Sequence, residues 1–565
     1  MTRRVIRMVG ALALALTAAG ALATGSLSAA QARSESVADV GTVYAPISGI
    51  GSTWSANALS QWARNVFSNY HWQITYADLG SSAGRQSFAT QGSGYDFAVS
   101  EIPYHLTNSD AKDPNPPRSF AYMPIVAGGT SFMYNLVIGG KRVTNLRLAG
   151  QTVADIFTGA ITKWNDPEIA ADNPALALPS TTIVPVVRSD GSGTTAQLTT
   201  WFRSQYPSTW DTFCVKVGRP HNCGITSNYP APDGFKAQAL STGVAGYVAQ
   251  SQYVGSITYV EYSYALNSHF PVAKLLNSAG YYNEPTAQNV AVGLLGSKIN
   301  EDSTSQDYLT QDLSGVYTNP DPRTYPLSSY SYMLIPTALE WGFTSNKGLT
   351  LAAFTDYFLC EGQQQAPQLG YSPLPINLVQ AGLSQVAKIP GGDPKNIDIS
   401  KCHNPTFSAD GSNTLANTAP QPPACDKKGA AQCTTGTGGA ASTSTVGTRA
   451  GSPTTSGGAS NDNSAGTTST TSSGTTAGDG VSLDGLSGGA SLPLTIAGAP
   501  VVLPALTPWA GILGASLALV IVIFVVLVPP VVARLRTAPD ERLRRRSRPR
   551  VPKRSPARRG LKIRP

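Results

Sequence analysis

The stretch Arg188-Ser189-Asp190-Gly191-Ser192-Gly193-Thr194-Thr195 lies between two segments of different periodicity. The β-branched run over 181–187 before it predicts a strand. After it, Leu198, Trp201 and Phe202 recur at three- and four-residue spacing, which predicts a helix. The stretch therefore predicts a strand-to-helix turn.

The composition of this turn favours a bound anion. Backbone amides point outward at a helix start, where the helix dipole is positive. Arg188 adds a permanently charged fork that suits oxyanions, and Asp190 is placed to hold it. The expected hydroxyl and amide donors are Ser192, Gly193 and Thr194. A capped turn with an incidental arginine is the alternative, and a P-loop is excluded because no Gly-Lys-Ser/Thr follows.

Two earlier turns and one strand end have the same character. The turn 49–54 precedes a helical pattern and offers the hydroxyl of Thr53 and the amide of Trp54, whose ring we expect in the core. The turn 79–85 offers Ser81. The segment 95–101 predicts a short strand ending in Glu101, which taken alone is as well explained as a solvated carboxylate.

The two ends of the chain predict export and membrane attachment. Residues 1–32 combine three arginines, an apolar run and a small-residue cleavage motif, so we expect a signal peptide, with an N-terminal anchor as the alternative. Residues 509–533 are long and apolar enough for one transmembrane helix. The tail 534–565 carries 14 Lys or Arg against two acids, which predicts a cytoplasmic location. Nucleic-acid binding by this tail, or a cell-wall sorting signal at 492–495, explains these features less well.

The net charge of +8 is therefore not a property of the exported part. Without the signal peptide and the basic tail the net charge is −7. Residues 426–487 are mostly Gly, Ser, Thr and Ala, and we expect a flexible, disordered linker between the globular part and the membrane.

Six cysteines in an exported chain favour disulfides. Sequential pairing is our prediction among the 15 possible connectivities. The expected pairs are Cys214 with Cys223, Cys360 with Cys402, and Cys425 with Cys433. A metal site at Cys214, His221 and Cys223 would lack a fourth ligand, so we expect no resident metal.

In their order along the chain, these motifs resemble those of the phosphate-binding receptors of high-affinity phosphate ABC transporters. The resemblance covers about residues 41–390. The segments that carry it are 49–54, 80–84, 96–101, 159–166, 188–194 and 246–248. Each motif alone is weak, and their combination is specific. Glu101 departs from the family, which has Asp there, and Trp54 stands where Phe is common.

The resemblance implies a two-lobed α/β fold of the periplasmic-binding-protein type, type II-like, over 41–425. Lobe 1 would comprise about 41–125 and 275–390, and lobe 2 about 126–274. It further implies that the lobes close on inorganic phosphate and present it to permease subunits, without a cofactor or catalytic residue. The implied phosphate ligands are Thr53, Trp54, Ser81, Glu101, Arg188, Ser192, Gly193 and Thr194, supported by Asp190.

Glu101 has a chemical consequence for the expected ligand. A buried carboxylate repels an anion unless the anion presents a proton, as hydrogen phosphate does near pH 7 and sulfate does not. Three alternatives stay open. The chain could bind another oxyanion, act as a surface sensor or adhesin, or be a secreted phosphatase, although neither a metal cluster nor a Ser–His–Asp order is evident.

Overall fold

The computed structural model describes residues 43–104, 106, 116–220, 224–393, 395, 397–408 and 410–447. The expected signal peptide, transmembrane segment and basic tail lie outside these residues. No helix within the described ranges combines the length and the apolar character needed to cross a bilayer.

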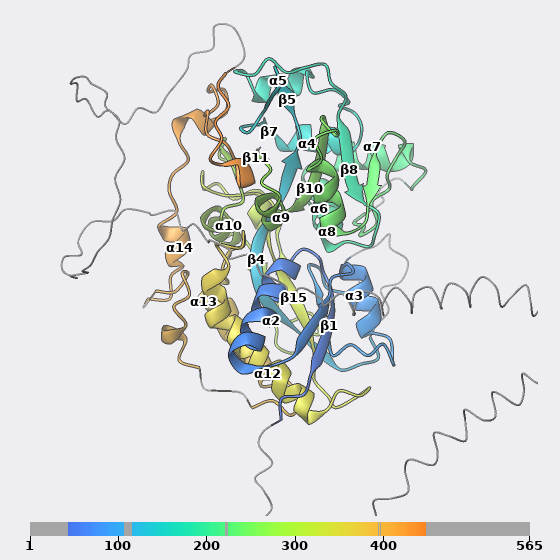
Figure 1. Ribbon diagram of the computed structural model, residues 1–565, viewed down its shortest axis with the longest axis vertical. Helices are drawn as coiled ribbons and strands as arrows, with labels where there is room; N and C mark the ends of the chain where they lie inside the picture. The colour runs from blue at the N-terminus through green and yellow to red at the C-terminus, as the bar shows by residue number, and fades with distance from the viewer. Residues whose placement is uncertain are drawn as a thin grey trace, which may run out of the picture. The chain divides into compact units, whose positions relative to one another are not determined.

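Two groups of strands share one long strand, β4 (Phe120–Tyr134), and so form a continuous 11-stranded sheet. Lobe 1 contains the order β2-β1-β3-β15-β4, in which β2, β1 and β3 are parallel and β15 is antiparallel to its neighbours. Its other elements are β1 (Ile47–Gly51), β2 (Ile74–Ala77), β3 (Phe97–Ser100), β15 (Ser328–Pro336), α2 (Ala56–Tyr70), α3 (Ser81–Phe88), α12 (Ser345–Leu359), η1 (Glu361–Gln365) and α13 (Ile376–Val386). Figure 1 shows α2, α3 and α12 around β1 and β15.

Lobe 2 continues the sheet in the order β4-β10-β8-β9, with β11 against the end of β4. Its strands are β7 (Arg147–Leu148), β8 (Val184–Arg188), β9 (Lys236–Gln238), β10 (Ser256–Glu261), β11 (Val272–Leu276) and β12 (Tyr282–Asn283). Its helices are α4 (Gly150–Phe157), α5 (Pro167–Asp172), α6 (Gly193–Gln205), α7 (Pro207–Lys216), α8 (Leu240–Val248), α9 (Tyr262–Asn267) and α11 (Ser314–Tyr317). Two short hairpins, β5–β6 (Val137–Ile138, Lys141–Arg142) and β13–β14 (Lys298–Ile299, Gln311–Asp312), complete the strands.

Each lobe has its own apolar core. The core of lobe 1 packs Trp62 of α2 against Phe358 of α12, with ring centroids 5.1 Å apart. The core of lobe 2 is built around the buried rings of Trp164, Trp201 and Trp210. The α/β class and the two-lobed arrangement predicted from the sequence are therefore confirmed.

The chain passes between the lobes at Gly128 and Gly129, where β4 changes partner from β15 to β10. Side chains are excluded at both positions. A Cβ at Gly128 would lie 2.8 Å from the Trp54 ring, and one at Gly129 would lie 2.4 Å from Pro285. The sequence predicted this boundary at about residue 125, and β4 changes partner after Gly129.

The return crossing differs from the expected boundary at residue 275. Tyr325 and Leu327 still belong to the core of lobe 2, as do Val316 and Tyr317 of α11. The chain rejoins the lobe 1 sheet at Ser328, where β15 pairs with Gly129. Val290, in the same part of the chain, belongs instead to the core of lobe 1, so packing decides the lobe residue by residue over 275–327.

The folded part also extends beyond the expected boundary at residue 425. Residues 426–447 pack on lobe 2 instead of beginning a linker. Lys274 of β11 forms an ion pair with Asp426 at 2.6 Å, and Thr437 donates to the carbonyls of Thr144 (3.0 Å) and Val272 (2.5 Å). The segment is held by polar contacts, mostly to backbone carbonyls. The prediction of a linker relied on its low apolar content, which does not detect such contacts. The remainder of the expected linker, 448–487, lies outside the described residues.

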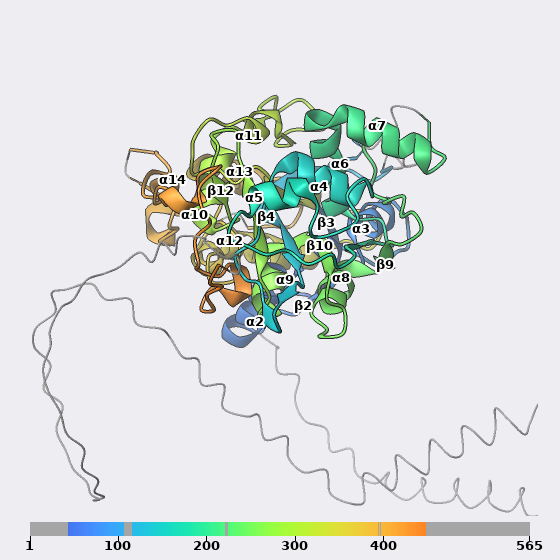
Figure 2. The same cartoon turned by 90° about the horizontal axis from the view of Figure 1, so that it is seen from above.

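The C-terminal segment 398–447 runs along both lobes. It contains η2 (Ile399–Cys402), α14 (Thr414–Asn417), η3 (Ala424–Asp426) and η4 (Gly438–Ala440). α14 lies beside α10 (Ala287–Leu294) in both views (Figure 1, Figure 2), with Ala416 packed on Ala291 and Val292. The segment therefore connects a part of lobe 1 to a part of lobe 2.

Disulfides hold both ends of this segment. Cys360 pairs with Cys402 on lobe 1, and Cys425 pairs with Cys433 on lobe 2, as predicted. Cys214 is also disulfide-bonded, and its expected partner Cys223 lies outside the described residues.

Candidate functional site

Four helix starts face one another where the lobes meet. α2 and α3 belong to lobe 1, and α6 and α8 belong to lobe 2. Hydrogen bonds join them in pairs across the gap: Thr53, just before α2, to Ser241 of α8 at 2.7 Å, and Ser81 of α3 to Gly193 of α6 at 3.1 Å. Since each helix start carries partial positive charge, their convergence creates an environment suited to an anion.

Arg188 is the fixed cation of this site. It ends β8 and is 2 % exposed. Its Nη1 donates to the hydroxyl of Thr53 at 3.0 Å and to that of Ser241 at 3.2 Å. Because both hydroxyl oxygens accept from the arginine, their own O–H groups are directed away from it. The arginine thus supplies charge and also orients two neutral donors.

Asp190 holds this arginine from the other side. Its carboxylate accepts from Nε of Arg188 at 2.7 Å, forms an ion pair with Nη2, and accepts from the amide of Leu240 at 2.8 Å. Burial alone would raise the pKa of Asp190, but the hydrogen bond and charge of Arg188 lower it below its ordinary value. The expected supporting role of Asp190 agrees with this geometry, because an ionised partner fixes the planar guanidinium.

Glu101 lies at the opposite side of the same cluster, directly after β3. It is 1 % exposed and accepts from Ser81 at 2.6 Å and from Ser331 of β15 at 2.7 Å. The lobes approach so closely here that a Cβ on Gly193 would lie 2.1 Å from Oε2 of Glu101. Arg188 and Asp190 offset each other's charge, and Glu101 adds a second carboxyl group to the cluster.

The remaining predicted residues are buried in the same place. Ser192 caps α6 by accepting from the amide of Thr195 at 3.2 Å, and Thr194 lies in the first turn of that helix. The Trp54 ring is fully buried, as expected, while its amide donates to Ser52 at 2.9 Å. That amide is already engaged in this conformation, so its expected role as a ligand donor requires Ser52 to release it.

The structure adds residues that sequence reasoning missed. Ser241 begins α8 and contacts both Thr53 and Arg188, and Ser331 contacts Glu101 from the middle of β15. Tyr259 of β10 accepts from the amide of Arg188 at 3.3 Å, and its burial raises its pKa to about 12. The segment Leu240-Ser241-Thr242-Gly243 is a small-residue helix start like the other three, and this signal could have identified Ser241. Ser331 has no comparable signal.

The arrangement can bind and orient an oxyanion. Groups of three or more His, Cys, Asp or Glu side chains able to hold a metal are absent from the described ranges. Hydrogen bonds bring five of the predicted ligands together from four separate segments of the chain: Thr53, Ser81, Glu101, Arg188 and Gly193.

A family profile described as a PBP superfamily domain matches residues 34–361. Among curated proteins, the phosphate-binding protein PstS of Xylella fastidiosa strain Temecula1 is 33% identical over 338 residues, which cover 59% of this chain and 83% of that protein. The phosphate-binding protein PstS of Haemophilus influenzae is 30% identical over 341 residues, covering 60% and 92%. The phosphate-binding protein PstS 3 of Mycobacterium tuberculosis strain H37Rv is 30% identical over 330 residues, covering 58% and 81%.

Proposed function

Because the chain belongs to the PBP superfamily, we propose that it binds inorganic phosphate outside the cytoplasm and delivers it to an ABC-type phosphate importer. The observation that carries this proposal is the buried meeting of Arg188 and Ser241 of lobe 2 with Thr53, Ser81 and Glu101 of lobe 1. The similarity to relatives named phosphate-binding proteins supports the same ligand.

Phosphate would enter by replacing contacts that the lobes now make with each other. The O–H groups of Thr53 and Ser241 would turn to phosphate oxygens, and Arg188 would add a charge-assisted pair. Ser81, Ser192, Thr194 and the Gly193 amide would donate from the remaining helix starts. The closed form is then stabilised by the ligand, which is how a hinged receptor reports occupancy to its permease.

Glu101 would select the protonation state of the ligand. Hydrogen phosphate can donate its proton to a carboxylate oxygen, whereas sulfate would face it with a lone pair. An unpaired buried charged group costs more than the ~1–3 kcal/mol of a neutral one. We therefore expect sulfate to bind at least about 100-fold more weakly than phosphate, taking ~1.4 kcal/mol for each factor of ten.

Calorimetric titration of the purified full chain with phosphate and with sulfate tests this function. Glu101→Gln should reduce the ratio of phosphate affinity to sulfate affinity at least about tenfold, because an amide can donate a hydrogen bond to sulfate. Glu361→Gln makes the same change at an exposed carboxylate of lobe 1 and should leave the ratio unchanged. Equal affinities of the wild type for both anions would refute phosphate selectivity.

We also propose that this chain is a receptor and not an enzyme. A chromogenic phosphoester should remain intact in its presence, and turnover would favour a phosphatase instead. The signal peptide 1–32, the span 509–533 and the cytoplasmic tail 534–565 complete the proposal as a single-pass anchor. Retention of the protein in washed membranes, and its release after deletion of 509–565, would support this topology.

A further inference from the structure

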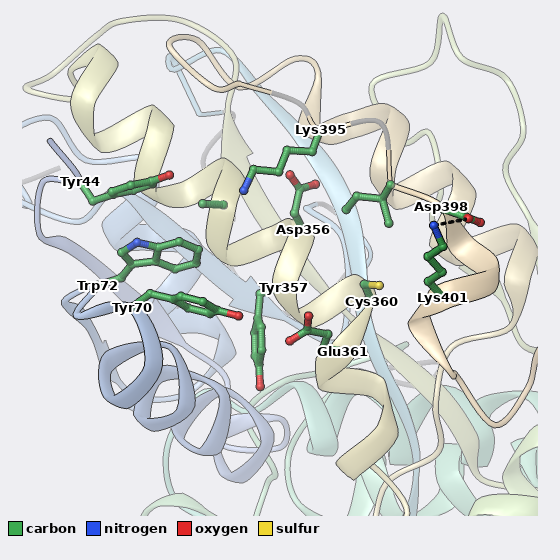
Figure 3. Close-up of a pocket in the computed structure, with 12 residues that line it drawn as sticks. Tyr44, Tyr70, Trp72, Asp356, Tyr357, Cys360, Glu361, Lys395, Asp398 and Lys401 are labelled. Carbon is green, nitrogen blue, oxygen red and sulfur yellow. Dashed lines mark ion pairs between the residues drawn. The ribbon is translucent and has the colours of Figure 1, made fainter. Parts of the chain in front are cut away.

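A cavity of about 630 Å³ lies in lobe 1, separate from the cluster between the lobes. Figure 3 shows it between the segment before β1, the end of α2, α12 and the segment after α13. The lining residues that matter here are Tyr44, Tyr70, Trp72, Ala353, Asp356 and Glu361. None of them belongs to the proposed phosphate site. The volume is in the range of sites for small organic molecules.

One wall of this cavity is a stack of three aromatic rings. The Trp72 ring lies between those of Tyr44 and Tyr70, with centroid distances of 5.0 Å and 4.7 Å. Both faces of the indole are therefore covered, and ring edges line the cavity (Figure 3). The wall offers apolar contact but no free Trp72 face for a sugar ring to stack on. Ala353 and Ile397 extend the apolar lining.

The floor of the cavity holds a buried carboxyl group, that of Asp356 on α12. Its side chain is 6 % exposed, and its Oδ2 atom is buried without a hydrogen-bond partner. The amide of Lys395 supports the carboxyl, and Figure 3 shows the group directed into the cavity. A buried acceptor without a partner is rare in folded proteins and indicates a missing donor.

The charges around Asp356 favour a cation as that donor. Asp398 and Lys401 form an ion pair with each other at 3.4 Å. This leaves the carboxylates of Asp356 and Glu361 against the single charge of Lys395 among the lining residues. An anion would face two carboxylates here. An ammonium group would instead supply the hydrogen-bond donor that the Asp356 carboxyl group lacks.

We propose that this cavity is a second ligand site, which binds a small organic amine. The ammonium group would donate to the carboxyl group of Asp356, whose side chain must turn to present the buried Oδ2 to the cavity, and the apolar body would lie against Tyr44, Trp72 and Ala353. A charge-assisted hydrogen bond supplies the specificity and the ring wall supplies buried apolar contact. This site is independent of the phosphate site in position and in ligand charge.

The test is calorimetric titration of the full chain, saturated with phosphate at pH 8, with 2-phenylethylamine and with its neutral analogue 2-phenylethanol. We expect the amine to bind at least about tenfold more tightly than the alcohol, the lower end of what a hydrogen bond to a charged group contributes. Asp356→Asn should remove this preference. Asp398→Asn changes a paired carboxylate at the rim and should retain it.

A second variant tests the cavity itself without changing its charge. Ala353→Leu places a larger side chain into the lining of the cavity and should abolish amine binding, while phosphate affinity stays at the wild-type value in both Asp356→Asn and Ala353→Leu. Failure of the wild type to bind the amine, equal binding of amine and alcohol, or retained preference in Asp356→Asn would each overturn the proposal. If the wild type bound the amine but not phosphate, the proposed phosphate site between the lobes would be refuted and the amine site would stand.

Discussion

Replacing Gly193 by alanine separates the stability of lobe 2 from closure of the two lobes. Gly193 is the first residue of α6 and has no positive φ, so the helix itself accepts alanine there. In an isolated helix this change stabilises by about 0.5–1 kcal/mol. In the assembled cluster, however, the new Cβ would lie 2.1 Å from Oε2 of Glu101 and 2.6 Å from Oγ of Ser81.

The size of the effect on binding follows from these distances. Ordinary heavy-atom contact is about 3.5 Å, so the Glu101 carboxylate must retreat by about 1.4 Å or the lobes must part. Either movement displaces the Gly193 amide and the Ser81 hydroxyl, two of the proposed phosphate donors, from the positions they hold in this structure. A hydrogen bond to a charged group contributes about 1.5–3 kcal/mol. Loss of one such bond predicts phosphate affinity lower by about 10-fold to 150-fold.

Calorimetry with phosphate and thermal unfolding without it measure the two effects on the same protein. The matched control is Gly246→Ala in α8, where a new Cβ would contact nothing within 4 Å. The control should gain stability and keep its affinity. If Gly193→Ala bound phosphate with wild-type affinity, Gly193 and Glu101 would not lie this close together in the phosphate-bound form.

Three further predictions concern single features of the molecule. Ser241→Ala removes an acceptor of Arg188 and a partner of Thr53, and should weaken phosphate binding about fivefold to tenfold by calorimetry; unchanged affinity would exclude Ser241 from the site. Burial raises the pKa of Asp356 from 3.8 to about 6. Between these two pH values the native carboxyl group keeps its proton, whereas the same group in the unfolded chain has released it. The free energy of unfolding therefore falls as pH rises from about 4 to about 6. Asp356→Asn should therefore gain about 1–3 kcal/mol over the wild type in denaturant unfolding at pH 8 and little at pH 4; an equal gain at both would contradict this linkage. Loss of the Cys360–Cys402 disulfide, with a sequence separation of 42, should destabilise more than loss of Cys425–Cys433, with a separation of 8. Loop entropy gives about 4 against 2.5 kcal/mol, and the reverse order of melting temperatures would show that native packing outweighs it.

Much of the candidate site was predictable because its chemistry is local. A helix start after a short glycine-containing turn exposes amides wherever it occurs, so the segments around Thr53, Ser81 and Ser192 indicate anion donors without knowledge of the fold. The two disulfides Cys360–Cys402 and Cys425–Cys433 were also predictable, because each joins cysteines that are consecutive in the sequence. Ser241 belongs to the same type of helix start and was within reach of this reasoning.

Other features depend on contacts that sequence patterns do not encode. Ser331 lies in the middle of a buried strand and contacts Glu101 only because β15 and β3 are neighbours in the sheet. Residues 426–447 fold because lobe 2 offers backbone carbonyls and Lys274 to a polar segment that has little apolar content of its own.

By itself, the sequence determined the type of fold and the kind of ligand, because strand and helix periodicity and the donors at helix starts are properties of short segments. Only the tertiary structure decided that these starts converge in pairs across the two lobes, that Glu101 approaches Gly193, and that Asp356 lies unpartnered in a separate cavity. The physical reason is that hydrogen bonds and burial depend on distance in space, and residues such as Thr53 and Ser241 are brought together only when both lobes are folded.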